Sequence, residues 1–566
     1  MGLQRKTNGD ASNSTPVASK KEVQHILTGG DPNEMYKITH TGDESDPLEG
    51  STDSSTEADN SLQDCGESVS VRACGTVKGQ DEGQSVRQAD GDSPSPSPIC
   101  NHEEEVLTDS WRGHRKHVFI LSEAGKPIYS RYGNEEALST TMGVMMALVS
   151  FVQSGDDNIR SIHSDDHTVV FMQQGPLVLV LVSNNKQSKQ QLHSELLYVY
   201  YQIVSMLTQA SINRIFEQKK NYDLRRLLAG CETILDGLLD FMDTDPSFLL
   251  SAVQCLPLPP SLRNSISQTL QRAITPNMVF SLLIVNDQLL TIVQERTVLE
   301  DARLKPTDLL LMLNFITSSS AFRGGEIWTP ICLPLFNSDC YFYAYIAYLD
   351  PPDCTVCLLL ISTDRNAFYA MAECKRKIEE NFRAQNVLDV ISKAQSYHVS
   401  HVGVPDLRHF MYMPFNIPDR HDKLPQFSSS LMEEPYMGLE RTRLLDLYRH
   451  MHSQIHSTTQ PLKIIYHVAP REVLFAWTTN KFELYTCFGP FVTKSSAINS
   501  VTKLLRWIKK AEDHLFILNP PKYSNVPSGR MNSSDGQSGS DRQETPDGGL
   551  NQSTINAPRC SPATTS

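Results

Sequence analysis

Two groups of residues have types and spacings that could support metal or redox chemistry. Cys354 and Cys357 form a Cys-x-x-Cys pair, a spacing found in zinc sites and in thiol–disulfide enzymes. His452 and His456 lie four residues apart, so on a helix they could share one face, with His450 close by. No second cysteine pair accompanies the first, and no carboxylate or cysteine stands near the histidines. A strand edge and a solvated helix face are the favoured interpretations, so we predict no metal and no cofactor.

Sequence motifs for phosphate binding and nucleophilic catalysis are missing. Gly125-Lys126 lacks the upstream glycine of a phosphate-binding loop and is followed by Pro127. The sequence also contains no Gly-x-Gly-x-x-Gly, no His-Glu-x-x-His and no Gly-x-Ser-x-Gly. We therefore predict a protein that is not an enzyme in the covalent sense and that works by binding other proteins.

The negative charge of the chain is concentrated at its N-terminus. The 566 residues carry a formal net charge of −14, and residues 1–105 alone contain 20 acidic and eight basic residues with one aromatic, Tyr36. Segments this poor in large apolar groups cannot offset the entropy of ordering, so 1–110 and 521–566 are predicted to be disordered tails. The nearly neutral middle gives no reason to expect nucleic-acid binding.

The cysteines and the apolar runs indicate a soluble, cytoplasmic protein. The 12 cysteines show no framework spacing, and several lie in strand-like runs, as expected for reduced thiols. The start of the chain lacks an apolar signal region. The longest apolar runs, such as 176–182 and 341–349, are far shorter than a membrane span.

Between the tails, one order of elements recurs three times, which predicts an α+β fold of three modules. The order is a hairpin, a helix, three strands and a helix. The first cycle has strands at 117–121, 128–132, 159–163, 168–173 and 177–183, with helices at 134–153, 190–218 and 223–242. The second has strands at 279–285, 289–294, 326–333, 341–349 and 355–362, with helices at 307–318 and 366–385. The third, less complete cycle has strands at 409–415, 462–467, 473–478 and 482–487, with helices at 439–455 and 497–516. Antiparallel sheets with helices on their faces follow from this order. The predicted domains are 111–260 (with a helical extension), 275–395 and 405–520.

The first-cycle helix carries more apolar surface than one sheet requires. Leu138, Met142, Met145, Val149 and Val152 form one stripe, and a second stripe widens it with Val144, Leu148 and Phe151. The excess predicts a contact with a partner, although a helix wedged inside its own domain would show the same pattern.

Trp328 and the basic runs are further candidates for binding. Trp328 lies between Gly325 and Pro330 at the start of a strand, where it could serve as an edge anchor, although a core position is slightly favoured. The runs Arg225-Arg226, Lys375-Arg376-Lys377 and Lys509-Lys510 are read as solvated helix faces, with anionic lipid headgroups as the alternative.

Longer stretches of sequence resemble one known family. The run 116–133, KHVFILSEAGKPIYSRYG, is followed by matching pieces at 135–138 and 142–145. Further matches are 221–228 (NYDLRRLL), the Trp328 segment with 332–334 (CLP), 405–410 (PDLRHF) and 506–510 (RWIKK). Together they cover essentially all of 112–520 and resemble the Mon subunit of the Mon–Ccz complex.

The resemblance implies three longin domains and a heterodimer with the Ccz subunit, joined through the first longin domain of each. It implies a guanine nucleotide exchange factor for the late-endosomal Rab seven GTPase, with a third, larger subunit in animals. It also implies recruitment to endosomal membranes by the early-endosomal Rab and phosphatidylinositol 3-phosphate, and a role in autophagosome–lysosome fusion. The alternative is a non-catalytic longin adaptor that binds Rabs without exchange activity.

Three groups of residues are assigned on this basis. Met145, Met146 and Val149 are expected to contact the partner or the GTPase, since methionine suits adaptable surfaces. Trp328 is expected to anchor the recruiting Rab. Lys375, Arg376 and Lys377 are a weak candidate for lipid binding.

Overall fold

The computed structural model describes residues 102, 104–106, 108–185, 187–295, 304–415 and 424–523. These residues form two compact units, one of residues 102–193 with 223–225 and one of residues 194–222 with 226–523. The predicted tails lie outside the described residues except at their inner ends, so their disorder stays a prediction.

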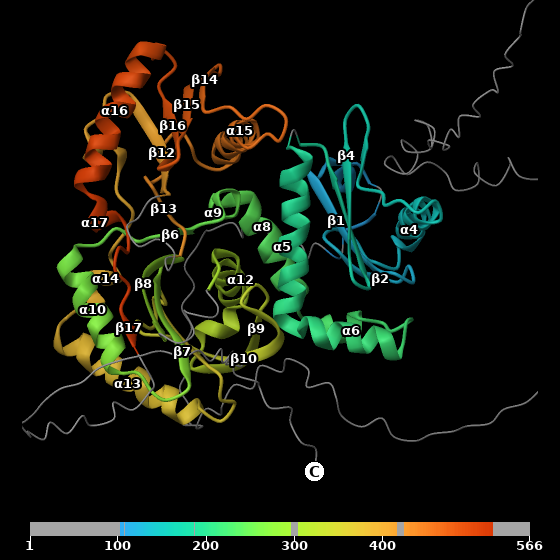
Figure 1. The fold of residues 1–566 in the computed structure, drawn as a ribbon, viewed down its shortest axis with the longest axis horizontal. Coiled ribbons are helices and arrows are strands. Elements are labelled where there is room, and N and C mark those ends of the chain that lie inside the picture. The colour runs from blue at the N-terminus through green and yellow to red at the C-terminus, as the bar shows by residue number, and fades with distance from the viewer. Residues whose placement is uncertain are drawn as a thin grey trace, which may run out of the picture. The chain divides into compact units, whose positions relative to one another are not determined.

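The first unit is built on a five-stranded antiparallel sheet with the strand order β2-β1-β5-β4-β3. Its β-branched and leucine-rich strands β1 and β5 are buried along their whole length. Helix α4 packs against one face of this sheet (Figure 1). The elements in chain order are α3 (Asp109–Gly113), β1 (Lys116–Ser122), β2 (Pro127–Ser130), α4 (Ser139–Gln153), β3 (Ser161–His163), β4 (Thr168–Gln174) and β5 (Leu177–Ser183). The predicted order of hairpin, helix and three strands is confirmed.

The second unit repeats this topology twice. Its first sheet has the order β8-β7-β11-β10-β9, and Asn286 and Asp287 both have positive φ, as a two-residue hairpin turn requires. The elements are β7 (Met278–Val285), β8 (Gln288–Glu295), α12 (Pro306–Thr317), η2 (Ser320–Arg323), β9 (Ile327–Leu333), β10 (Asn337–Tyr348), β11 (Val356–Ser362), α13 (Phe368–Ala384) and α14 (Leu388–Ile391). Every predicted element of the second cycle is present.

The third sheet has the order β13-β12-β16-β15-β14, the same as the other two. Its helices α15 and α16 flank the sheet (Figure 1) and pack into the apolar clusters on its opposite faces. The elements are η3 (Val399–Val402), β12 (Leu407–Pro414), β13 (Gln426–Ser429), α15 (Leu439–Ile455), β14 (Ile464–Val468), β15 (Val473–Thr478), β16 (Phe482–Phe488), α16 (Lys494–Lys510) and α17 (Glu512–Leu515). The sequence missed β13, so the third cycle is complete rather than partial.

The predicted helical extension of the first domain makes its contacts in the second unit. From residue 194 onward, except for residues 223–225, the chain belongs to that unit. The Asn314 amide donates 2.9 Å hydrogen bonds to the Gln202 side chain and to the Ile234 carbonyl. Arg449 donates to the carbonyl of Met242 at 2.9 Å. The helices are α5 (Lys189–Leu207), α6 (Gln209–Gln218), α7 (Arg225–Leu228), α8 (Glu232–Thr244), α9 (Ser247–Leu250) and α10 (Pro260–Arg272).

Short strands that the sequence did not predict join the two sheets of the second unit. Strand β6 (Val253–Gln254) pairs in parallel with β13, and the next residue, Cys255, bridges to Leu289 of β8. Strand β17 (Lys522–Tyr523) pairs in parallel with β8. Buried Arg263 donates 2.7 Å and 2.6 Å hydrogen bonds to the carbonyls of Phe516 and Leu256. Main-chain pairing and one buried guanidinium thus hold the second and third domains together.

A fully buried histidine lies at the centre of the third domain. His409 of β12 is 0% exposed, with its Nδ1 2.9 Å from the Tyr448 hydroxyl and its Nε2 3.0 Å from the Ser429 hydroxyl. Burial, with a smaller contribution from Arg441, lowers the pKa of His409 to about 3. Below about pH 6.5 the unfolded chain therefore binds a proton here that the folded chain does not.

Acidification is accordingly expected to destabilise the third domain through His409. Stability is lost as the pH falls from 6.5 toward 3, by about 2 kcal/mol at pH 5 from this residue. Urea unfolding at pH 7 and pH 5 checks this, with His409→Gln as the comparison because it cannot titrate. Wild type should lose more stability between the two pH values than the variant does. Equal losses would show that His409 is protonated in the folded protein.

Candidate functional site

The three first-domain residues expected to contact a partner lie in the core of their own domain. Met145, Met146 and Val149 are 3%, 9% and 3% exposed and pack on α4 against the sheet of the first unit. The Met146 side chain lies so close to Gly125, in the β1–β2 turn, that a Cβ atom added to this glycine would be 3.4 Å from it. Contact with a partner would require these side chains to leave that core, so their assignment to a partner stays a prediction that their burial does not favour.

The opposite side of α4 carries the second apolar stripe, which we call the outer stripe: Val144, Leu148 and Phe151. Phe151 is 57% exposed, while Val144 and Leu148 are half-buried. The polar and small neighbours Gly143, Ala147 and Ser150 are exposed along the same helix. The excess apolar surface predicted for this helix is therefore real, and it belongs to the outer stripe.

Trp328 is at the edge of the second sheet, as one of the two interpretations expected. It lies on β9, which is the last strand of the sheet order, and it is half-buried. The indole N–H donates a 3.0 Å hydrogen bond to the Arg365 carbonyl, and the ring stacks on Tyr343 with centroids 5.8 Å apart. Pro330 in the same strand removes one main-chain donor from this edge. The indole thus packs against the core of its own domain, next to Phe368 of α13, and stays partly exposed.

The basic run on α13 is neutralised by glutamates of the same helix and by Glu326, which immediately precedes β9. Lys375 is ion-paired with Glu326 at 3.3 Å and with Glu379 at 2.8 Å. Arg376 and Lys377 contact Glu373 at 2.6 Å and 3.6 Å. Because each cation already has a carboxylate partner, this face is not a positively charged surface. The geometry gives the lipid assignment no support.

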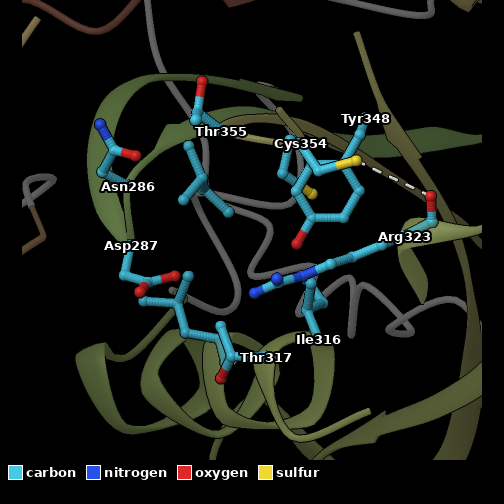
Figure 2. A pocket seen from close by; sticks show the side chains of 11 residues that line it. Asn286, Asp287, Ile316, Thr317, Arg323, Tyr348, Cys354 and Thr355 are labelled. Atoms are coloured by element: carbon cyan, nitrogen blue, oxygen red, sulfur yellow. Dashed lines mark hydrogen bonds between the residues drawn. The ribbon is translucent and has the colours of Figure 1, made fainter. Parts of the chain in front are cut away.

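The cysteine pair lines a small cavity in the second domain. The cavity lies between the β7–β8 turn, α12 and the β10–β11 loop, with Asp287, Arg323 and Tyr348 in its wall (Figure 2). It encloses about 90 Å³, room for a few water molecules rather than for a nucleotide or organic cofactor. Cys354 and Cys357 are both reduced, and burial raises the pKa of the Cys357 thiol, which keeps it protonated. We therefore interpret Cys354 and Cys357 as packing residues in the wall of this cavity.

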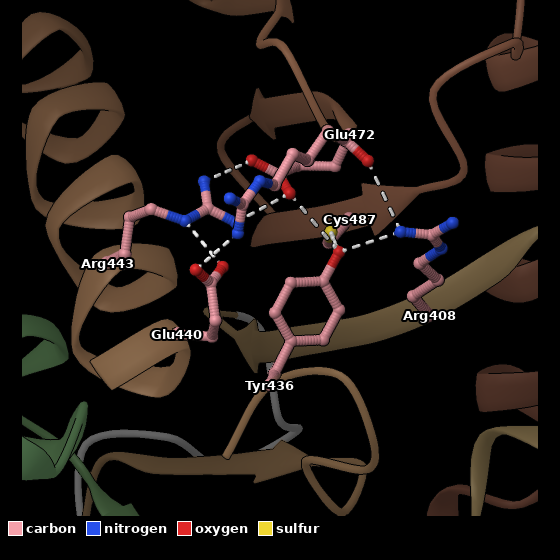
Figure 3. A network of polar contacts seen from close by, with 7 residues as sticks. Arg408, Tyr436, Glu440, Arg443, Glu472 and Cys487 are labelled. Atoms are coloured by element: carbon pink, nitrogen blue, oxygen red, sulfur yellow. Dashed lines mark hydrogen bonds and ion pairs between the residues drawn. The ribbon is translucent and has the colours of Figure 1, made fainter. Parts of the chain in front are cut away.

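A buried carboxylate organises the charges of the third domain. Glu472 is 0% exposed and accepts hydrogen bonds from both terminal nitrogens of Arg443, at 2.6 Å and 2.8 Å (Figure 3). Arg443 also donates to Glu440 at 2.7 Å, and the Tyr436 hydroxyl lies 3.4 Å from Glu472. Arg408 donates to the Tyr436 hydroxyl at 3.3 Å. Both carboxylates here are paired with arginines, so we interpret the network as a tie between α15 and the start of β15.

The histidines of α15 do have a carboxylate beside them, contrary to the expectation from sequence. Glu483 of β16 lies 3.1 Å and 3.2 Å, through its two oxygens, from His456 Nε2. The His452 and His456 rings are 4.2 Å apart. Within the described residues, these three are the only set of three such groups whose ligand atoms gather, all within 4.8 Å of one another. The sequence did not reveal Glu483, because only the packing of helix on sheet brings it near.

The surroundings of His456 and His452 shift the pKa values of these two imidazoles in opposite directions. The hydrogen bond from His456 to Glu483 holds the pKa of His456 above its usual value. Burial, together with nearby His456, lowers the pKa of His452 to about 4, so this imidazole is neutral at physiological pH.

Across the described part of the chain, no helix combines the length and apolar character needed to cross a bilayer.

Comparisons with known proteins agree with three longin domains. Models for the first, second and third longin domains of FUZ, MON1 and HPS1 match residues 116–238, 276–380 and 406–512. The chain is 53% identical over 455 residues to human vacuolar fusion protein MON1 homolog B. The aligned region covers 77% of this chain and 83% of that protein. It is 50% identical over 453 residues to MON1 homolog A of Gallus gallus, at 78% and 80% coverage. Protein SAND of Takifugu rubripes is 49% identical over 425 residues, at 74% and 79% coverage.

Truncation on the two sides of α4 should affect stability to very different extents. Met145→Ala should lower the free energy of unfolding by about 2–5 kcal/mol, because it opens a cavity in the core. Phe151→Ala should change it by less than about 0.5 kcal/mol, because most of that ring already faces water. Urea unfolding of the full chain measures both. Comparable losses in the two variants would mean that the outer stripe is covered by the chain's own core.

Proposed function

The chain belongs to the MON1 family of vacuolar fusion proteins, and from that membership we propose that it is a subunit of a guanine nucleotide exchange factor for the late-endosomal Rab seven GTPase. The proposed complex pairs this chain with the Ccz subunit through the first longin domain of each. In the cell it would drive the conversion of early into late endosomes, and fusion with lysosomes and autophagosomes.

The observation that carries the proposal is the outer stripe of α4. An apolar strip that stays partly exposed although its helix already covers a sheet marks a contact with another protein. Phe151 is the natural anchor, because exposed aromatic side chains supply a large share of the binding energy in protein interfaces. We assign the Ccz subunit to this surface in place of the buried Met145, Met146 and Val149.

An exchange factor needs no reactive centre. In this chain the Cys354–Cys357 pair lines a small cavity and Glu472 is ion-paired with Arg443, which agrees with such a role. Such a protein binds the nucleotide-free GTPase more tightly than the loaded one, and so displaces the switch loops and the phosphate contacts. A thousandfold faster release needs about 4 kcal/mol of differential binding. A few well-placed side chains in one interface can supply that amount.

Recruitment is proposed to use the edge of the second sheet. Trp328 is half-buried on β9, the last strand of its sheet, and we assign its exposed part and this sheet edge to the early-endosomal Rab. Phosphatidylinositol 3-phosphate membranes and a third, larger subunit remain part of the proposal. We assign no lipid-binding residues, because Lys375, Arg376 and Lys377 are paired with glutamates.

The exchange activity is expected only from the assembled pair. Release of a fluorescent GDP analogue from the late-endosomal Rab should be fast with this chain and Ccz together, and slow with either alone. A pair that releases nucleotide no faster than buffer would refute the exchange role. A pair that binds the Rab but leaves the release rate unchanged would favour the alternative, a non-catalytic longin adaptor.

Charge placed on the outer stripe should separate the two subunits. The double variant Leu148→Asp/Phe151→Asp is expected to weaken Ccz binding by about 2 kcal/mol or more, roughly 30-fold, because it buries two carboxylates in an apolar contact. The control is Ser150→Asp, which adds a charge at an exposed position of the same helix outside the stripe. Isothermal titration measures both affinities. If Ser150→Asp weakens binding as much as the double variant, the contact is not specific to the stripe.

A further inference from the structure

We propose that His452, His456 and Glu483 form a binding site for a divalent transition-metal ion of the zinc type in the third longin domain. The site would fasten the C-terminal end of α15 to the start of strand β16. This inference is independent of the exchange activity, because none of the three residues lies in the first domain.

The helix presents the two imidazoles on one side. His452 and His456 are four residues apart, and the His456 backbone N–H still donates a 2.9 Å bond to the His452 carbonyl, so the helical register reaches His456. Side chains at this spacing lie one above the other, and their ring centroids are 4.2 Å apart. This is the pair spacing with which helices hold zinc in metalloenzymes.

The neighbouring strand supplies the third group already oriented. Glu483 is the second residue of β16, and its side chain is 4% exposed. The Tyr485 hydroxyl donates a hydrogen bond to Glu483 Oε1, which fixes the carboxylate from behind. Such an outer partner is typical of metal-ligating carboxylates and histidines.

The distances fit a tetrahedral ion after a small closure. Zinc bonds to histidine nitrogen and carboxylate oxygen are about 2.0–2.2 Å long, so the ligand atoms lie about 3.4 Å apart. His456 Nε2 and the Glu483 oxygens are at 3.1 Å and 3.2 Å, and all three groups lie within 4.8 Å of one another. A closure of at most about 1.4 Å, within the reach of side-chain torsions, completes the triangle. His456 is 48% exposed, which leaves an entry path and a fourth position for water.

The chemistry of the donors selects the ion and its role. Two imidazoles and one carboxylate suit zinc and its transition-metal neighbours, whereas magnesium and calcium prefer sets made only of oxygen. The residue after His452 is Ser453, where zinc hydrolases of the His-Glu-x-x-His type carry their general base. The ion would therefore act as a structural clamp between helix and strand.

The test is titration of the chelator-treated full-length chain with zinc chloride, followed by calorimetry. Because the chain has 12 cysteines, whose thiols can also take up zinc, the comparison among variants decides the result. Wild type should bind one equivalent that His456→Asn and Glu483→Gln both lose. His450→Asn, which removes an exposed histidine of the same helix outside the cluster, should keep it. Tyr485→Phe should keep the equivalent with affinity weakened about 10–100-fold.

Thermal unfolding gives a second readout that a general loss of structure would not reproduce. The unfolding midpoint should rise on adding zinc for wild type and His450→Asn, and should not respond for His456→Asn. His456 is half-exposed, so its variant is expected to match wild type without zinc. Should Glu483→Gln fail to fold, the His456→Asn comparison still decides. Equal zinc stoichiometry and affinity in His456→Asn and wild type, or no zinc bound by wild type, would overturn the proposal.

Discussion

Central strands of the first two sheets are apolar on both faces, and the third sheet carries one apolar cluster on each face; this constraint shapes the rest of the molecule. Strands β1, β5, β7 and β11 are buried at every position, so none of them alternates between core and solvent. A sheet of this kind must be covered on both sides, which is why helices follow and precede each one. In the part of the chain that the structure describes, the backs and ends of helices and the edges of sheets are then the surfaces available for binding.

The same constraint decides how much of the fold the sequence could predict. Long apolar strands and periodic helices were predicted correctly in all three cycles, because the spacing of their apolar residues along the chain indicates which positions are buried. Strand β13 was missed because Gln426–Ser429 is short and polar for a buried strand. Strands β6 and β17 have two residues each, and they exist because a distant strand offers hydrogen-bond partners. Local pattern carries no trace of such pairing.

The candidate sites divide along similar lines. Helical periodicity showed two stripes on α4 but could not say which one faces the sheet, so Met145 was chosen where Phe151 was the exposed residue. The neutral character of the Lys375 run was readable in advance, since Glu373 and Glu379 stand at helix-neighbour spacings. The sequence could not show that Glu483 belongs to the histidine cluster, because it contacts His456 only once β16 has packed beside α15.

A protein built this way can act on a partner only through surfaces that its own cores do not consume. The outer stripe lies on the back of a helix whose inner side already belongs to a sheet, so a bound partner leaves the core of that domain unchanged. The histidine cluster lies where a helix ends over a strand, and an ion there would tighten an existing contact without forming a new one. Both proposed sites lie on surfaces that remain exposed after the domain cores have packed. Differential binding by such preformed surfaces is sufficient for nucleotide exchange, because the step to be accelerated is the loosening of contacts in the GTPase.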